Sequence, residues 1–182
     1  MTWTTPIRGH CFCNGCSYTI DPTLSIPLET KQHFKGRPGE TLYFECLHDH
    51  CTSCRRASSN LSVPWLIFPP QWLSWAPGSS EHLKTFKSSN GDVERQFCGT
   101  CGTSFSYFRH SRNLVIDINM ATLSDRDLEK IEELGLVPKR HGSWSFGFKW
   151  WQKTFVDAAK ASGEVLQAWK GSSSDPKGRV EF

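Results

Sequence analysis

Closely spaced cysteines constrain this chain more than any other feature of its sequence. Three pairs stand out, and they are Cys11 with Cys13, Cys51 with Cys54, and Cys98 with Cys101. Two thiolates one or two residues apart can grip one tetrahedral Zn²⁺ from a single turn, and Gly102 permits the turn that follows the last pair. These short spacings suit a metal better than disulfides to distant partners. We therefore predict zinc sites.

The residues near the N-terminus indicate the redox state of these thiols. Arg8 and His10 follow the first residues in place of an apolar stretch, so we expect no signal peptide and a reducing, cytoplasmic location. No segment has transmembrane length, so we expect no membrane partner. The net charge is only +3 and no long run of Lys or Arg occurs, so we expect no nucleic-acid partner. Thiols in such a compartment favour metal over disulfides.

The length and composition predict one domain. With 182 residues and 37% hydrophobic residues the core is lean, although 8 Trp and 12 Phe bury large areas. We expect a single zinc domain over residues 1–170 and a polar, flexible tail over residues 171–182. Nothing in the sequence specifies an oligomeric state.

Most of the chain has the alternating pattern of β-strands. Residues 7–20 predict a hairpin that turns at Asn14-Gly15, and residues 21–40 predict a loop. Further strands are expected at residues 41–46, 62–70, 83–87, 93–97, 105–107 and 114–120. The strands at 83–87 and 93–97 are expected to form a second hairpin, which turns at Asn90-Gly91. Ser124 with Asp127 resembles a capping box and predicts a helix that ends before Gly135. A second helix is expected over residues 150–160. The fold class is therefore mainly β.

The pair Cys98 and Cys101 supplies half of a closed metal site. The other half is either Cys11 with Cys13, or Cys13 with Cys16. On a strand, side chains two residues apart point the same way, so Cys11 and Cys13 can face one metal. We favour Cys16 as a small buried hydrophobic residue.

The stretch around Cys51 and Cys54 has the highest density of chemically active residues. Its neighbours are His48, Asp49 and His50 on one side and Arg55 and Arg56 on the other. Two arrangements remain open: a closed structural site completed by Cys46 and a histidine, or an open three-ligand site with Asp49. Arg55 either binds a substrate carboxylate or stays at the surface.

These motifs occur in an order that resembles the glutathione-dependent formaldehyde-activating enzyme family, and in particular its fungal members. The matching segments are Gly9-His10-Cys11-Phe12-Cys13, Cys51-Thr52-Ser53-Cys54-Arg55-Arg56-Ala57-Ser58 and Phe97-Cys98-Gly99-Thr100-Cys101-Gly102-Thr103. Weaker similarities are Ala121-Thr122-Leu123-Ser124-Asp125 and His141.

The resemblance implies a β-tent zinc fold with one or two short helices in its C-terminal part. It implies a structural zinc on four cysteines, namely Cys11, Cys13, Cys98 and Cys101. A second, catalytic zinc is bound in the family by a Cys-x-Cys-x-x-Cys motif, whose last two positions match Cys51 and Cys54. The first position falls on Asp49, so the third ligand is Asp49 or else His48, His50 or Cys46.

The resemblance also implies an activity. It is that of a zinc-dependent carbon–sulfur lyase of the S-(hydroxymethyl)glutathione synthase type, acting on formaldehyde or another small carbonyl compound together with glutathione or its adduct. Asp49, Cys51, Cys54 and Arg55 would then carry catalysis. Two alternatives remain. One is a zinc enzyme of the same fold that isomerises, dehydrates or hydrolyses another carbonyl metabolite, and the other is a zinc-stabilised module that only binds glutathione or a protein.

Overall fold

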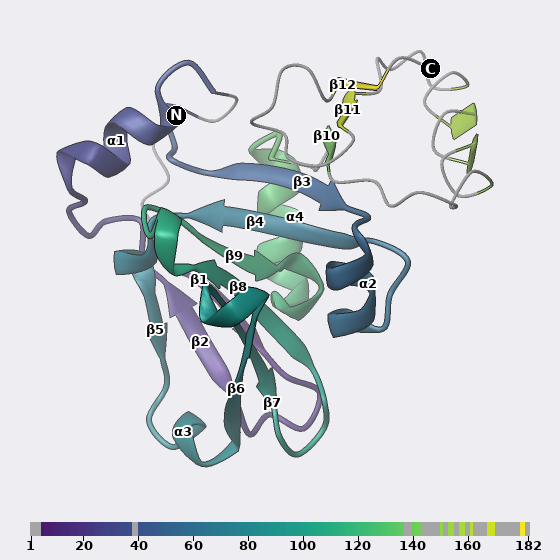
Figure 1. The fold of residues 1–182 in the computed structure, drawn as a ribbon. Coiled ribbons are helices and arrows are strands. Elements are labelled where there is room, and N and C mark those ends of the chain that lie inside the picture. Colours follow the sequence, from purple (N-terminus) through teal and green to yellow (C-terminus); the bar gives the residue numbers. More distant parts are fainter. Residues whose placement is uncertain are drawn as a thin grey trace. The chain divides into compact units, whose positions relative to one another are not determined.

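A computed structural model of the chain describes residues 5–37 and 40–136 and, beyond them, residues 140–142, 150, 153–154, 157–158, 161, 167–169 and 179–180 (Figure 1). The fold is mainly β with short helices, as predicted. The chain forms two compact units: Met1–Glu45 with Leu66–Leu136, and Cys46–Trp65 with Val137–Phe182. Two of the three boundaries between these units fall inside strands, namely β3 (Glu45–Asp49) and β4 (Val63–Phe68).

The first unit contains antiparallel strands and a C-terminal helix. Besides parts of β3 and β4, its elements are β1 (Ile7–His10), β2 (Ser17–Ile20), α1 (Leu28–Phe34), η1 (Pro70–Trp72), β5 (Leu73–Trp75), α3 (Ser79–His82), β6 (Leu83–Ser88), η2 (Ser89–Gly91), β7 (Val93–Cys98), β8 (Ser104–Arg109), η3 (His110–Arg112), β9 (Ile116–Asn119), η4 (Met120–Thr122) and α4 (Asp125–Glu133). One sheet has the order β1-β2-β5. A second antiparallel ladder runs through β6, β7, β8 and β9 in sequence order (Figure 1).

Two predicted hairpins are confirmed, and asparagine forms part of each turn. β1 pairs with β2, and Asn14 in the connecting turn has a positive φ of 59°. β6 pairs with β7, and Asn90 between them has a φ of 57°. Asparagine tolerates this left-handed region better than most residues. The second hairpin delivers Cys98 at the end of β7.

The core of the first unit lies between its two sheets. Tyr18 of β2, Trp75 of β5 and Phe105 of β8 make edge-to-face contacts with ring centroids 5.0 to 5.9 Å apart. Such geometry is favoured by the aromatic quadrupoles. The Tyr18 hydroxyl is buried and lies 2.7 Å from Oγ1 of Thr122. Because Thr122 donates its own proton to the carbonyl of Asn119, Tyr18 donates to Thr122.

The predicted capping of the helix after Ser124 is confirmed. The Ser124 side chain accepts a hydrogen bond from the backbone N–H of Asp127 at 3.3 Å and donates to its carboxylate at 2.8 Å. That carboxylate also accepts from the backbone N–H of Arg8 at 2.8 Å. Ile131 is the buried residue of α4. The cap therefore joins the helix to β1.

Three short helices were not predicted, and α3 is one of them. Residues 21–40, expected to be a loop, contain α1, in which only Thr30 and Phe34 are buried. Residues 52–58, expected to carry a knuckle-like pair, form α2 (Thr52–Ser58). The strand expected at residues 41–46 begins only at Glu45, because Tyr43 before it has a positive φ of 54° that no extended strand adopts.

The second unit contains the remainder of β3 and β4, helix α2 and three short strands. These strands are β10 (Arg140–Gly142), β11 (Gln167–Trp169) and β12 (Arg179–Val180). β10 runs parallel to β3 and to β11, and β11 pairs antiparallel with β12. The helix expected over residues 150–160 and the tail expected from residue 171 lie mostly outside the described residues.

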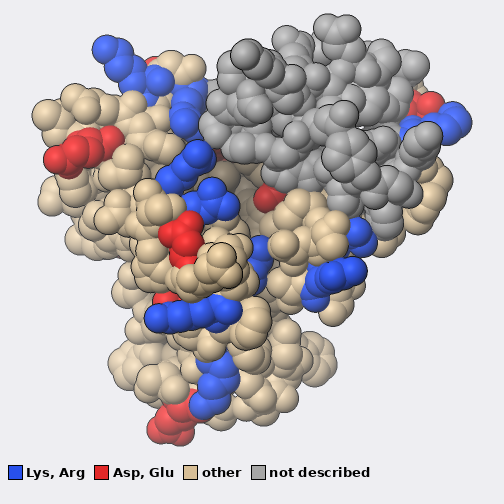
Figure 2. Space-filling model, in the orientation of Figure 1, with Lys and Arg blue, Asp and Glu red and all other residues tan. Residues whose placement is uncertain are grey.

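The surface carries charges of both signs. On the face drawn in Figure 2, Lys and Arg side chains are interspersed with Asp and Glu side chains, with uncharged surface around them. Within the described part of the chain, no helix combines the length and apolar character needed to cross a membrane.

Candidate metal centres

The first cysteine turn follows β1. Cys11 and Cys13 lie in the turn of the hairpin rather than on a strand, so the strand alternation that we expected to align them is wrong. The backbone N–H of Asn14 donates to the carbonyl of Cys11 at 3.0 Å, and the N–H of Cys11 donates to the carbonyl of Cys16 at 2.9 Å. A tight turn therefore places the two thiols together, with their Sγ atoms 3.5 Å apart.

The second cysteine turn connects β7 to β8. The N–H of Gly102 donates to the carbonyl of Cys98 at 2.9 Å, and Gly102 has a positive φ of 77°. Glycine is therefore needed at this position, as the sequence indicated. The backbone N–H groups of Cys101 and Thr100 point at Sγ of Cys98 and help to lower its pKa, against a desolvation that raises it. This is the arrangement of a metal-binding knuckle.

The structure brings both turns together. The ligand atoms of Cys11, Cys13, Cys98 and Cys101 all lie within 4.8 Å of one another, and the Sγ atoms of Cys13 and Cys98 are 3.7 Å apart. Sulfurs about 2.3 Å from a tetrahedral Zn²⁺ lie roughly 3.8 Å apart, so this spacing fits the ion. All eight cysteines are in the described part of the chain, and none of them forms a disulfide there.

Cys16 is outside this four-cysteine group, although the sequence left it open as a ligand. Its side chain is fully buried, and its Sγ lies 3.9 Å from the carbonyl of Ser79. Burial, with a smaller contribution from Cys98, raises the pKa of the Cys16 thiol to about 12. Cys16 therefore keeps its proton and packs as a small buried residue.

Within the four-cysteine group, Cys13 and Cys101 differ in their affinity for protons. Desolvation raises the pKa of Cys101, but hydrogen bonds from the Thr103 hydroxyl and backbone outweigh it and lower that pKa to about 5. The N–H of Gly15 lowers the pKa of Cys13, but hydrogen bonding with Cys11 and burial together raise it to about 12. At neutral pH Cys101 is therefore a thiolate and Cys13 a thiol, so metal binding must release a proton.

A second candidate group lies entirely in the second unit. Asp49 ends β3, Cys51 caps helix α2, and Cys54 lies in its first turn; their ligand atoms are within 4.8 Å of one another. Sγ of Cys51 accepts the backbone N–H of Cys54 at 3.2 Å, and Sγ of Cys54 lies 3.6 Å from Oδ2 of Asp49. Oxygen and sulfur ligands of one tetrahedral Zn²⁺ lie about 3.5 Å apart, so these three residues also fit the ion.

Other residues that the sequence offered for this second site do not join the group of close ligand atoms among the described residues. These residues are Cys46, His48 and His50. Burial lowers the pKa of His48, so its ring is neutral at pH 7, and the rings of His48 and His50 lie 6.1 Å apart. Arg55 lies in the last turn of α2, and its catalytic role stays a prediction.

Two residues that contact the four-cysteine group, Thr103 and His82, were not predicted to have a role there. Thr103 lies two residues after Cys101, with its Oγ1 3.2 Å from the sulfur of that ligand. His82 contacts the same turn from the end of α3. The position of Thr103, two residues after the Cys-x-x-Cys motif, was a signal available in the sequence. Nothing in the sequence pointed to His82.

Comparison with known proteins gives a match to one protein family. The family model described as glutathione-dependent formaldehyde-activating enzyme matches residues 6–134. A solved structure of a Rhodobacter sphaeroides protein is similar with a TM-score of 0.46 and 20% identity, covering 66% of this chain and 94% of that one. Curated proteins give no match.

Proposed function

This chain belongs to the glutathione-dependent formaldehyde-activating enzyme family, and we propose that it is a zinc-dependent carbon–sulfur lyase of the S-(hydroxymethyl)glutathione synthase type. In the reaction, the sulfur of a thiol such as glutathione bonds to the carbonyl carbon of formaldehyde or another small aldehyde. The thiol proton passes to the carbonyl oxygen, which yields a hemithioacetal. The reverse direction breaks the same carbon–sulfur bond.

The observation that supports this proposal most is the group of Asp49, Cys51 and Cys54. Their three ligand atoms lie within 4.8 Å of one another. Catalytic zinc sites typically have three protein ligands and keep a fourth position for water or substrate, whereas structural sites have four protein ligands. Zn²⁺ bound there would supply Lewis acidity for a carbonyl oxygen or a thiol sulfur. The four-cysteine group is closed in this sense and serves the fold.

The chain's own residues have distinct tasks in this site. The N–H of Cys54 holds the sulfur of Cys51 in place at the start of α2, which fixes the direction of that ligand. The carboxylate of Asp49 and the sulfur of Cys54 meet at 3.6 Å, although they come from a strand and a helix. Arg55, next to Cys54 in sequence, carries a positively charged guanidinium that could pair with a substrate carboxylate.

A second candidate function follows from Asp49 itself. The family pattern has a cysteine where this chain has Asp49, and a carboxylate makes a bound zinc a harder Lewis acid than a thiolate does. Carbonyl, hydroxyl or water chemistry on another small metabolite then becomes favourable. This second activity would need no thiol substrate, which separates it from the first.

The test combines metal content with turnover. We expect two zinc ions per chain in the parent and one in Asp49→Ala and Cys51→Ala, while the matched variant Cys46→Ala keeps two. Formation of S-(hydroxymethyl)glutathione from formaldehyde and glutathione should accelerate with the parent and with Cys46→Ala, but not with the other two variants. One zinc in all four proteins would refute the catalytic site and favour a binding module. Two zinc ions with turnover of a carbonyl substrate in the absence of any thiol would favour the second activity.

A further inference from the structure

The ligands of the four-cysteine group come from two turns that are far apart in the chain. Cys13 and Cys98 are separated by 85 positions, and each turn has its own internal hydrogen bonds. If nothing else connected the turns, a metal would have to supply all of the free energy that holds them at ligand spacing. The contacts between the turns therefore decide how well the site is formed before a metal arrives.

Thr103 makes the first of these contacts. Its Oγ1 accepts a hydrogen bond from the backbone N–H of Phe12 at 3.2 Å, and the same oxygen lies 3.2 Å from Sγ of Cys101. A hydroxyl has one proton to donate and two lone pairs, so it can accept from Phe12 and donate to Cys101 at the same time. One side chain thus joins the first turn to a ligand of the second.

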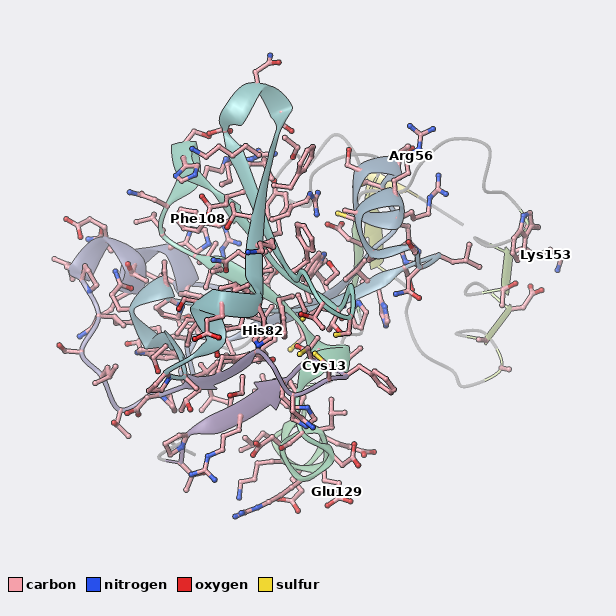
Figure 3. All side chains as sticks on the ribbon, turned by 90° about the horizontal axis from the view of Figure 1, so that it is seen from below. Cys13, Arg56, His82, Phe108, Glu129 and Lys153 are labelled. Carbon is pink, nitrogen blue, oxygen red and sulfur yellow. The ribbon has the colours of Figure 1, made fainter. Side chains whose placement is uncertain are left out.

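His82 makes the second contact between the turns. Its carbonyl accepts the N–H of Gly99 at 2.7 Å, and its Nδ1 is hydrogen-bonded to Oγ1 of Thr100 at 2.8 Å. Its ring packs on Gly15 of the first turn, where a Cβ would lie 2.8 Å from Cγ of His82. Figure 3 shows His82 beside the turn that contains Cys13.

We propose that Thr103 and His82 are positioning residues that hold the two cysteine turns at ligand spacing and thereby slow the release of the metal. Hydrogen-bond partners of metal ligands typically change metal affinity by about 10- to 100-fold. This inference concerns the four-cysteine group in the first unit and does not depend on the reaction proposed for Asp49, Cys51 and Cys54.

The experiment measures zinc release to excess chelating dye, in full-length protein carrying Cys51→Ala so that only the four-cysteine group is counted. We expect Thr103→Val, which keeps the shape but removes the hydroxyl, to release zinc about 10- to 100-fold faster. Thr103→Ser restores the hydroxyl and should release zinc at close to the parent rate. Thr85→Val is the matched control, because Thr85 is exposed on β6 and should leave the rate unchanged.

A further variant tests the second contact by itself. Thr100→Val removes the hydrogen bond to His82 and should accelerate release by a smaller factor than Thr103→Val. The proposal is overturned if Thr103→Val releases zinc at the parent rate, or if Thr103→Ser is as fast as Thr103→Val. If Thr100→Val releases zinc at the parent rate, the part of the proposal that concerns His82 is overturned. A Cys51→Ala protein without zinc would overturn it as well, whatever the outcome for the proposed reaction.

Discussion

Gly9 of β1 lies close against Tyr18 and Thr122, and its replacement by alanine should be strongly destabilising. Gly9 of β1 makes an isolated antiparallel bridge with Leu123. A Cβ on Gly9 would lie 2.2 Å from Oη and 2.3 Å from Cζ of Tyr18, and 2.5 Å from the backbone oxygen of Thr122. Since Tyr18 is only 2% exposed and Thr122 contributes backbone, neither neighbour can move aside freely.

The magnitude follows from these contacts. Overpacking of a well-packed core costs about 1–3 kcal/mol. Displacing Tyr18 also breaks its hydrogen bond to Thr122, which contributes about 0.5–1.5 kcal/mol. The sum for Gly9→Ala is about 2–4 kcal/mol. For a chain of this size it lowers the Tm by roughly 5–15 °C.

The assay is thermal unfolding of the zinc-loaded protein, followed by circular dichroism. Arg8→Ala serves as the control, because Arg8 is the neighbouring residue on β1 and its side chain is exposed. Exposed substitutions usually stay within about 0.5 kcal/mol of the parent. If Gly9→Ala unfolds within the same margin as Arg8→Ala, the close approach of Tyr18 to this strand is refuted.

Three further predictions follow from the described contacts. Burial raises the pKa of Tyr18, so its phenol stays neutral in the folded chain but ionises above about pH 10 in the unfolded chain. The free energy of unfolding should therefore fall as the pH rises above about 10, by at most about 1.4 kcal/mol per pH unit. In Tyr18→Phe, the free energy of unfolding measured by urea titration should fall less steeply above about pH 10, because the phenol is absent. An identical pH dependence in both proteins would contradict this prediction. Cys16→Ala should keep the zinc content of the parent, as measured by metal analysis, because Cys16 is outside the four-cysteine group; loss of one zinc would make it a ligand. Ser124→Ala removes the cap of α4 and should cost about 0.5–2 kcal/mol in urea unfolding, whereas Ser124→Thr keeps the hydroxyl and should stay near the parent. Equal stability of all three proteins would show that the cap is unimportant.

The sequence predicted the elements whose signals are local. Asn14 and Asn90 marked hairpin turns because few residues accept a positive φ, and Ser124 marked a helix start because its side chain satisfies a backbone N–H. Helices α1 and α2 were missed because each has 7 residues, too few to show a helical period. Helix α2 is capped by the Cys51 side chain, and α1 has no side-chain cap but packs Phe34 against Tyr43, contacts that no short pattern reports.

The candidate sites were predictable to a similar degree. The spacing of the cysteines indicated which residues meet, because a Cys-x-x-Cys turn has few ways to present two sulfurs to a metal. The reason given for Cys11 and Cys13 was nevertheless wrong, since a turn aligns them and not a strand. The contacts of His82 could not be predicted, because they depend on how α3 packs against two turns.

The 85 positions between Cys13 and Cys98 also set an order of events during synthesis of the chain. At about 5–20 residues per second, a ribosome needs roughly 4 to 17 seconds to extend the chain over that distance. During this interval the N-terminal pair has only two thiols to offer, and the hairpin of β6 and β7 does not yet exist. The four-cysteine site therefore cannot close before Cys98 and Cys101 have been added, and until then Cys11 and Cys13 are open to oxidants and to competing metal ions.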